Sequence, residues 1–392
     1  MGNFVAKHRW VILAAGAAIQ ILTGIPAAWG VFQKPVGAEY GLSSQQCSLI
    51  FACTIAFFGI GCVPGGALQD RFGPRAAGLS GSALLAGGML LSAWVPAGAG
   101  LLLIGSFSLL VGMGCAFLYP AVMSPAQKWY ADRKGLATGV IGGAVGLSGS
   151  ALTLLVRGLN AAVGIRGAFL VLGGLLAAVC GGASVLLCNP LHASPSGGNG
   201  PAGSYSPGEL LRTRQYYLIF SAVALAAPCV LLFSPIILEL GQQRGLTEQQ
   251  SLAAIAIGSF GSAAGRLAAP ALSDRLGRRR VDLVLFAALC ALSVLFAFSG
   301  GWWVVAVYTA LTFCYSGQAA LLPALATDLF GWKNAGVNYG LLALGTSAGS
   351  LAFTFLAGGF SAVWPRHLTA ALAAAGGFVA LALLRPTPGG RL

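Results

Sequence analysis

The chain consists of long apolar runs separated by short polar segments. Twelve such runs stand at residues 10–33, 45–69, 76–95, 99–124, 136–157, 166–188, 215–240, 248–273, 281–299, 302–326, 335–358 and 362–384. Folded as a helix, each run is long enough to cross a hydrocarbon layer of about 30 Å. The pattern therefore predicts an all-α membrane protein with twelve transmembrane helices embedded in a lipid bilayer.

The composition and the placement of charge agree with this prediction. Of the 392 residues only 8% are charged, against about 25% in a soluble domain. The net charge of +13 would favour a nucleic-acid partner in a soluble chain. If both termini lie inside, however, sixteen lysines and arginines fall on the inner side, five fall on the outer side, and Arg266 lies within a run, which accounts for all 22. The positive-inside rule then predicts a multi-pass protein of the inner (cytoplasmic) membrane with cytoplasmic termini and no nucleic-acid partner.

A segment of different composition divides the chain. Residues 189–213 are rich in serine, glycine and proline, which is typical of a flexible linker. We therefore predict an N-terminal six-helix bundle over residues 1–188, a cytoplasmic linker over 189–213, and a C-terminal six-helix bundle over 214–392.

Two landmarks repeat in the two halves. Gly-Leu-Ser-Ser-Gln-Gln at 41–46 matches Gly-Leu-Thr-Glu-Gln-Gln at 245–250, and both look like helix starts with a capping box. Asp-Arg-Phe-Gly-Pro-Arg at 70–75 matches Asp-Arg-Leu-Gly-Arg-Arg at 274–279. Both pairs are offset by 204 residues. This predicts a duplicated unit whose even number of spans makes the repeats parallel.

One full charge, Arg266, lies deep inside an apolar run. It stands eight residues before Asp274, or about 12 Å along a helix. If Asp274 marks the membrane surface, Arg266 lies near the middle of the hydrocarbon layer, where a cation costs at least about 2.5–3.5 kcal/mol. Such a cation needs water, a partner or an anionic ligand, which makes Arg266 the strongest candidate for a binding residue.

The turn after the second run resembles a known signature. Gly-x-x-x-Asp-Arg-x-Gly-x-Arg at 66–75, with a second copy that has Pro270 in place of the first glycine, is similar to the motif of the major facilitator superfamily. The resemblance implies two six-helix bundles around a central cavity. It also implies that the charged side chains of the two turns form a cytoplasmic network that controls conformational cycling: Asp70, Arg71, Arg75, Asp274 and Arg275.

A finer resemblance rests on four other segments. Tyr119-Pro120, the stretch 127–139, the stretch 323–331 and Asn-Tyr-Gly at 338–340 look like the oxalate/formate antiporter family and the related monocarboxylate transporters. In both groups an arginine in the eighth span contacts the substrate carboxylate, and Arg266 occupies that place. The resemblance therefore implies a small carboxylate as the substrate. Monocarboxylate transporters often have an acidic residue one turn earlier. This chain has Ser262 there, on the same helical face as Arg266, and we take it as a further candidate substrate-binding residue.

The chain departs from the oxalate pattern in the eleventh span. Oxalate carriers of the family place a second cation there, whereas residues 341–349 carry no charge. A single buried cation would leave one charge of a dicarboxylate unpaired at a cost of several kcal/mol. We therefore predict a secondary transporter for a monocarboxylate such as lactate, formate, acetate or pyruvate. The alternatives are an oxalate/formate-type dicarboxylate antiporter and a carboxylate sensor that does not transport.

The remaining candidates and exclusions complete the hypothesis. Tyr119 and Tyr315 could hydrogen-bond the substrate. Three further side chains could line the cavity: Gln20, Trp29 and Gln318. No nucleotide-binding motif, paired carboxylates or spaced Cys/His set occurs, so we expect no enzyme activity, no cofactor and no metal. With no Asp or Glu well inside a span, exchange and proton-coupled symport are both open. We expect a monomer.

Overall fold

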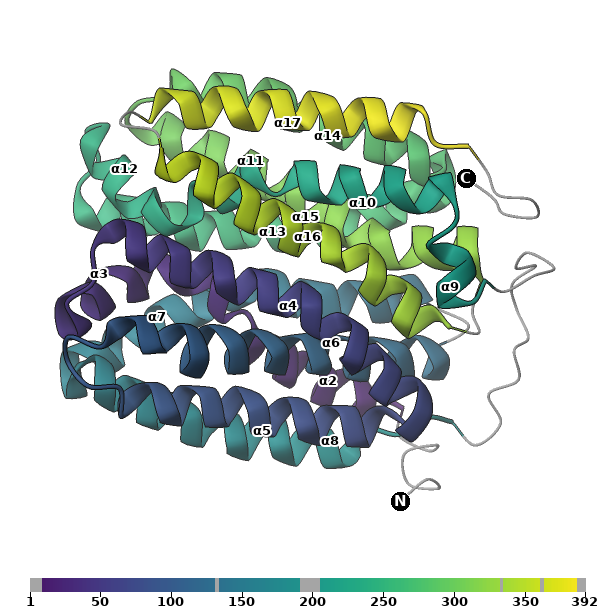
Figure 1. The fold of residues 1–392 in the computed structure, drawn as a ribbon, viewed down its shortest axis with the longest axis horizontal. Coiled ribbons are helices and arrows are strands. Elements are labelled where there is room, and N and C mark those ends of the chain that lie inside the picture. Colours follow the sequence, from purple (N-terminus) through teal and green to yellow (C-terminus); the bar gives the residue numbers. More distant parts are fainter. Residues whose placement is uncertain (1–8, 131–133, 191–204, 332–333, 360–362, 386–392) are drawn as a thin grey trace.

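The computed structural model describes residues 9–130, 134–190, 205–331, 334–359 and 363–385. Among these residues the regular secondary structure is helical, without strands. The start of α2 and the end of α17 lie at one end of the molecule (Figure 1), which we call the near end. The turns after α3 and α12 lie at the opposite, far end. The middle of the predicted linker, residues 191–204, lies outside the described residues.

The helices of each half form a group of their own, and the two groups lie against each other (Figure 1). The first half contains α2 (Trp10–Thr23), η1 (Ile25–Ala28), α3 (Trp29–Tyr40), α4 (Ser44–Phe72), α5 (Pro74–Ala93), η2 (Gly100–Leu102), η3 (Ile104–Leu109), α6 (Leu110–Trp129), α7 (Lys134–Leu176), η4 (Ala177–Gly181) and α8 (Gly182–Leu186). The second half contains α9 (Pro207–Leu210), α10 (Arg214–Ala226), α11 (Pro228–Leu231), η5 (Ser234–Ile236), α12 (Ile237–Gln243), α13 (Glu248–Leu276), α14 (Arg278–Ala297), α15 (Trp302–Phe330), α16 (Ala335–Gly358) and α17 (Trp364–Ala382).

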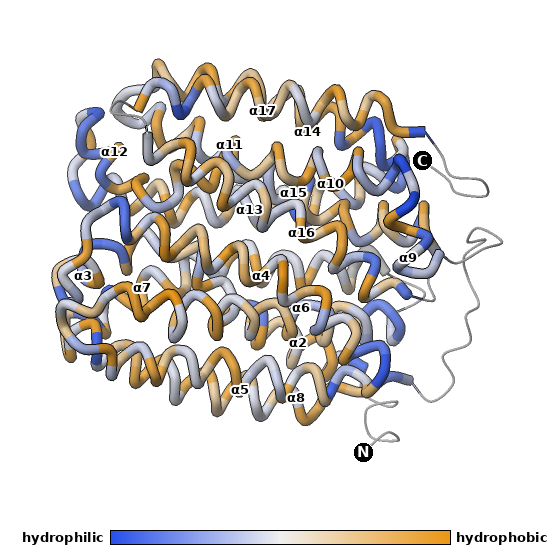
Figure 2. The backbone as a smooth tube through the Cα atoms, viewed as in Figure 1, coloured by the Kyte–Doolittle hydropathy of each residue, from blue (hydrophilic) through white to orange (hydrophobic). Residues whose placement is uncertain are grey.

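The helices have the length and polarity of membrane spans. Within the described residues nine segments are long and apolar enough to cross a membrane, and a tenth results if α2 and Ile25–Tyr40, bent by 41°, count as one. One of the nine, Ala137–Leu186, contains a non-helical break at Gly164. Apolar residues cover the flanks and hydrophilic residues gather at the two ends (Figure 2). The prediction of an all-α membrane protein is confirmed. The predicted count of twelve spans is reached only if Ala137–Leu186 is divided at Gly164 into two spans and α17 is counted as well, so this count stays a prediction.

The repeat is visible in the helices themselves. α4 and α13 are each 29 residues long, and the helices that follow them, α5 and α14, are each 20 residues long. Ser43 and Thr247 cap α4 and α13 with complete capping boxes, as the two sequence landmarks predict. Both helices end at a glycine with positive φ, Gly73 at 87° and Gly277 at 91°, which other residues adopt only under strain. The same local chemistry therefore builds the same hairpin twice.

The first and seventh runs are broken at corresponding prolines. α2 ends at Thr23 and Pro26 is the second residue of η1, while α10 ends at Ala226 and Pro228 begins α11. A proline lacks the N–H that would continue the helical hydrogen-bond ladder. The breaks leave irregular backbone inside the first and seventh apolar runs. Membrane proteins tolerate such backbone where it lines a cavity.

The two halves touch along α4 and α16. Ser347 Oγ donates to the carbonyl of Ala56 at 2.6 Å. A Cβ on Gly340 would lie 2.7 Å from the backbone of Cys62, so this glycine permits the close approach. Small residues at such a crossing let helix backbones pack without bulky side chains between them.

A second contact between the halves joins α7 and α13. Ser150 Oγ donates to the carbonyl of Ala256 at 2.8 Å. A Cβ on Gly146 would lie 2.3 Å from Ala263 Cα, closer than real atoms approach. A Cβ on Gly142 would lie 3.4 Å from Arg266 Cβ, so the glycine run of α7 packs directly behind Arg266.

The predicted charge network at the near end differs between the two turns. Asp70 accepts hydrogen bonds from the backbone of Gly336 and Val337 at the start of α16, so it joins the two halves. In the second turn Asp274 pairs with Arg278 at 2.6 Å, and Arg278 also reaches Asp328 at 3.3 Å. This second network stays within its own half.

The three arginines predicted from the motif, Arg71, Arg75 and Arg275, have exposed side chains. The Arg71 guanidinium lies 5.3 Å from the ring of its neighbour Phe72, and Arg75 is exposed. Arg275 is also exposed and forms no ion pair within the described part of the chain. Arg278 takes the place expected for Arg275: it is the first residue of α14, and the turn at Gly277 brings it back to Asp274 at the end of α13.

The end of the linker is ordered against the second half. Tyr205 N–H donates to Phe330 O at 3.0 Å, and the Asn338 amide donates to Tyr205 O at 3.1 Å. Ser206 caps the short helix α9 in a capping box with Glu209, whose pKa these hydrogen bonds hold below its usual value. The linker predicted over 189–213 therefore includes a helical, anchored segment.

We predict that Gly146→Ala destabilises this packing by about 1–3 kcal/mol, because the added methyl group overpacks the contact with Ala263. Thermal unfolding of the purified protein measures the effect. Gly158→Ala is the matched control in the same helix, since its Cβ would meet nothing within 4 Å. Equal midpoints for the two variants would contradict the close α7–α13 contact.

Candidate functional site

A cavity of about 230 Å³ lies between the two halves. Pockets for drug-sized ligands measure about 300–1,000 Å³, so this one suits a smaller molecule. Six of the seven predicted substrate-binding residues line it, from α2 and α6 on one side and α13 and α15 on the other: Gln20, Tyr119, Ser262, Arg266, Tyr315 and Gln318.

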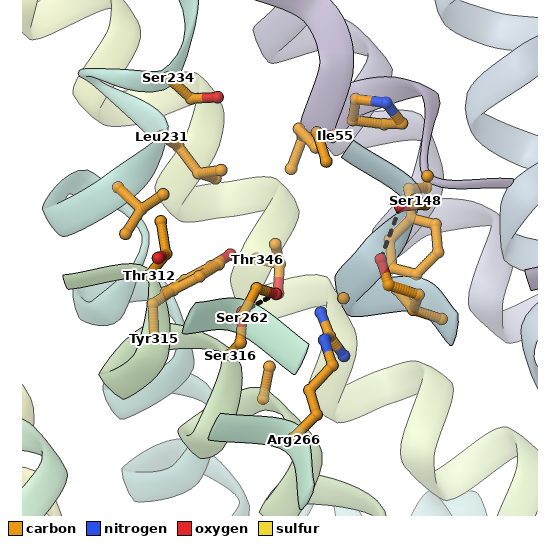
Figure 3. A pocket seen from close by; sticks show the side chains of 18 of the residues that line it. Ile55, Ser148, Leu231, Ser234, Ser262, Arg266, Thr312, Tyr315, Ser316 and Thr346 are labelled. Atoms are coloured by element: carbon orange, nitrogen blue, oxygen red, sulfur yellow. Dashed lines mark hydrogen bonds between the residues drawn. The ribbon is translucent and has the colours of Figure 1, made fainter. Parts of the chain in front are cut away.

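Arg266 is the one charged residue among the side chains that line this cavity in the described structure. It is half-buried, its Nε atom is inaccessible, and that atom has no hydrogen-bond partner among the described residues. The side chain reaches into the cavity, with Ser262 and Ser316 beside it (Figure 3). The protein therefore holds a cation at the cavity wall without supplying an anion to match it.

The hydroxyl groups of the wall are largely satisfied by the protein. Ser262 and Ser316 share a hydrogen bond of 2.6 Å, Ser259 donates to Ile255 O at 2.8 Å, and Thr312 donates to Gly258 O at 2.9 Å. The side-chain atoms of the described lining that are buried without a partner are Arg266 Nε and Gln20 Nε2. Both are donors, and they come from opposite halves. Two side chains of the lining thus keep an unpaired donor atom, although neither atom is accessible in this conformation.

Four tyrosines also line the cavity: Tyr119, Tyr308, Tyr315 and Tyr339. The rings of Tyr119 and Tyr339 stack across the halves with centroids 5.8 Å apart and planes 20° apart. The charge of Arg266 acts electrostatically on Tyr119, Tyr315 and Tyr339. Tyr339 was not selected from the sequence, although it stands in the Asn-Tyr-Gly segment. In that triplet Asn338 donates a hydrogen bond to Tyr205 of the linker, Tyr339 lines the cavity, and Gly340 allows the close packing of α4 against α16.

Trp29 does not line the cavity. It is 1% exposed and packs among aromatic rings, with centroids 5.2 Å from Phe107 and 6.1 Å from Phe32. The prediction that Trp29 lines the cavity is therefore wrong for this structure. Trp29 is the first residue of α3, after the break around Pro26, and its side chain packs in the interior of the first half rather than in the cavity wall.

Acidic side chains are absent from the described lining. Asp282, at 4% exposure, is buried elsewhere in α14, and Glu239 lies in α12. No group of three potential metal ligands occurs among the described residues. The nine cysteines, of which Cys115 lines the cavity, are free thiols. The polar groups of the described lining are thus arginine, amide, hydroxyl and thiol groups.

The known proteins that this chain resembles are described as transporters. The sequence profile of the Major Facilitator Superfamily matches residues 11–281 and, in a second match, 219–391. The uncharacterized MFS-type transporter YhjX of Escherichia coli is 25% identical over 88% of this chain and 86% of its own. The oxalate:formate antiporter of Oxalobacter formigenes is 24% identical over 85% of this chain and 80% of its own. Monocarboxylate transporter 13 of Bos taurus is 32% identical over 42% of this chain and 38% of its own.

A solved structure has the same fold. The crystal structure of a POT family transporter in complex with 5-aminolevulinic acid superposes with a TM-score of 0.69 over 95% of this chain and 94% of that chain, at 13% identity. At that identity the likeness concerns the fold alone. With two matches of the family profile that together span nearly the whole sequence, the chain belongs to the Major Facilitator Superfamily of transporters.

Proposed function

We propose that this protein is a secondary transporter that carries a small monocarboxylate of the lactate, formate, acetate or pyruvate class by alternating access. The observation that carries the proposal is Arg266, the one charged side chain of the described lining, at a small cavity between the halves. One carboxylate supplies one negative charge, which matches this single cation. Similarity to the monocarboxylate transporters supports the same class.

Binding by groups from both halves couples the ligand to conformation. Gln20 and Tyr119 belong to the first half, and Arg266, Tyr315 and Tyr339 belong to the second. A carboxylate bound between them stabilises the state in which the halves are closed around it. When the halves part on one side, contacts to one half are lost and the ligand is released. Asp70, near the end of α4, holds the start of α16 and would act as a latch in this cycle rather than as a ligand.

The second candidate is an oxalate/formate-type antiporter. It is supported by the similarity to the oxalate:formate antiporter of Oxalobacter formigenes. Against it stands the charge of the cavity, since Arg266 is the one cation of the described lining. A second carboxylate would remain unpaired in a region of low dielectric, at a cost of several kcal/mol.

Replacement of Arg266 tests the binding role. We expect Arg266→Ala and Arg266→Lys each to lower carboxylate uptake into proteoliposomes by at least about a hundredfold, because removing one partner of a buried pair costs several kcal/mol and lysine lacks the bidentate fork. Thermal unfolding should show both variants folded. Normal uptake by Arg266→Ala would refute the assignment.

The number of fixed charges predicts the transport mode. An empty carrier reorients with the Arg266 charge unpaired, whereas a carrier loaded with a monoanion reorients with the charge neutralised. Exchange of labelled lactate should therefore exceed net uptake, and monocarboxylates should inhibit better than oxalate. Flux assays on the purified carrier in liposomes measure both. Oxalate as the best inhibitor would favour the dicarboxylate antiporter instead.

The latch predicts a separation of binding from cycling. Asp70→Asn weakens the charge-assisted hydrogen bonds to the start of α16 without touching the cavity. We expect slower exchange with an unchanged equilibrium affinity, measured by flux and by calorimetric titration. A large loss of affinity with normal cycling would show that Asp70 acts on the ligand site.

A further inference from the structure

The far end of the molecule contains a second cavity between the two halves. Its volume is about 280 Å³, and its lining comes from the start of α4, the segment around η5, the end of α16 and the start of α17. The polar lining consists of Ser44, Gln45, Ser48, Thr354 and Arg366. Arg366 is the charged member of this described lining, and no acidic side chain belongs to it.

Arg366 is an unsatisfied cation. Its Nε atom is inaccessible and has no partner, and the side chain forms no ion pair within the described residues. Two other arginines of the far end are satisfied by the protein. Arg244 donates to Ser299 Oγ at 3.0 Å and lies 3.0 Å from His367 Nε2, and Arg166 pairs with Glu39 at 2.6 Å. Arg366 therefore differs from these two arginines in lining a cavity without an ion-pair partner among the described residues.

A short stretch of broken helix separates this cavity from the one that holds Arg266. Leu231, 9% exposed, lines both cavities. Three residues later Ser234 lines the cavity of Arg266, while its neighbours Pro235 and Ile236 line the far-end cavity. Leu231 and Ser234 lie on one side of the central cavity, away from Arg266 (Figure 3). A movement of this non-helical segment would connect the two spaces.

We propose that the far-end cavity is a capture site for the carboxylate substrate, in which Arg366 binds the anion before it passes Leu231 to reach Arg266. The proposal rests on the transport function proposed above. A fixed cation in a cleft raises the local concentration of anions and speeds their association. Because Leu231 stands between the sites, Arg366 does not act as a second cation for a ligand held at Arg266.

Glu239 sets the strength of this capture. It borders a smaller hollow of about 150 Å³ that Arg366 also lines, yet the two side chains do not form an ion pair. Its negative charge lowers the attraction of the site for an anion. This keeps capture weak enough for the ligand to move on.

Directional kinetics test the proposal. Initial rates of radiolabelled lactate uptake are measured from the far-end face and from the near-end face, in membrane vesicles of both orientations. With one charged hydrogen-bond donor removed, Arg366→Gln should raise the KM from the far-end face by about five- to tenfold and leave the KM from the near-end face and the maximal rate unchanged. Glu239→Gln should lower the far-end KM. High salt should raise the wild-type far-end KM by screening Arg366.

Matched variants separate capture from other roles. Arg157→Gln removes a charge from an exposed position of α7 outside both cavities and should leave the far-end KM unchanged. Arg366→Lys should stay close to wild type. Equal KM values for Arg366→Gln and Arg157→Gln, or an equal rise from both faces, would overturn the proposal. If Arg366→Gln does not fold, an unchanged far-end KM in Glu239→Gln overturns it. Failure of the wild type to carry any monocarboxylate would instead reject the proposed function, and the capture site with it.

Discussion

The uncompensated charge of Arg266 is the constraint on which the rest of the site depends. Burying a cation at mid-membrane depth costs several kcal/mol unless an opposite charge or water offsets it. The protein surrounds Arg266 with tyrosines and satisfied hydroxyls but with no carboxylate among the described lining. The glycines of α7 let the other half pack directly behind it, so its backbone cannot retreat. An anionic ligand is then the simplest way to neutralise the site, and reorientation becomes easier when the ligand is present.

The helix contacts explain how a ligand at this point can govern the whole molecule. α4 with α16 and α7 with α13 join the halves through glycines and serine-to-carbonyl hydrogen bonds. Such contacts are close and free of long side chains. At the near end a charged group joins the halves instead, where Asp70 meets the start of α16. The packing contacts and the proposed binding residue therefore lie together in one interface, and the proposed latch lies at its near end.

The sequence predicted the features whose chemistry has one explanation. The paired capping boxes were found as predicted at Ser43 and Thr247. The lone arginine of an apolar run, Arg266, lines the central cavity, while its binding role stays a prediction. Aromatic residues were harder, because a tyrosine or tryptophan in an apolar run packs a core as readily as it lines a cavity. Trp29 was chosen and Tyr339 was missed for that reason. Arg366 and Arg278 lay at span ends, where exposure is the normal expectation and only the three-dimensional contacts show which arginine is satisfied.

The central claim is that Arg266 recognises the negative charge of the substrate. The most direct measurement is calorimetric binding of lactate and of its uncharged isostere lactamide to the wild-type protein and to Arg266→Gln. The wild type should bind lactate at least about a hundredfold more tightly than lactamide, because the amide offers no charge to the buried cation, and Arg266→Gln should lose that preference. Equal binding of the two ligands by the wild type, or a preference for lactate that survives in Arg266→Gln, would contradict the account.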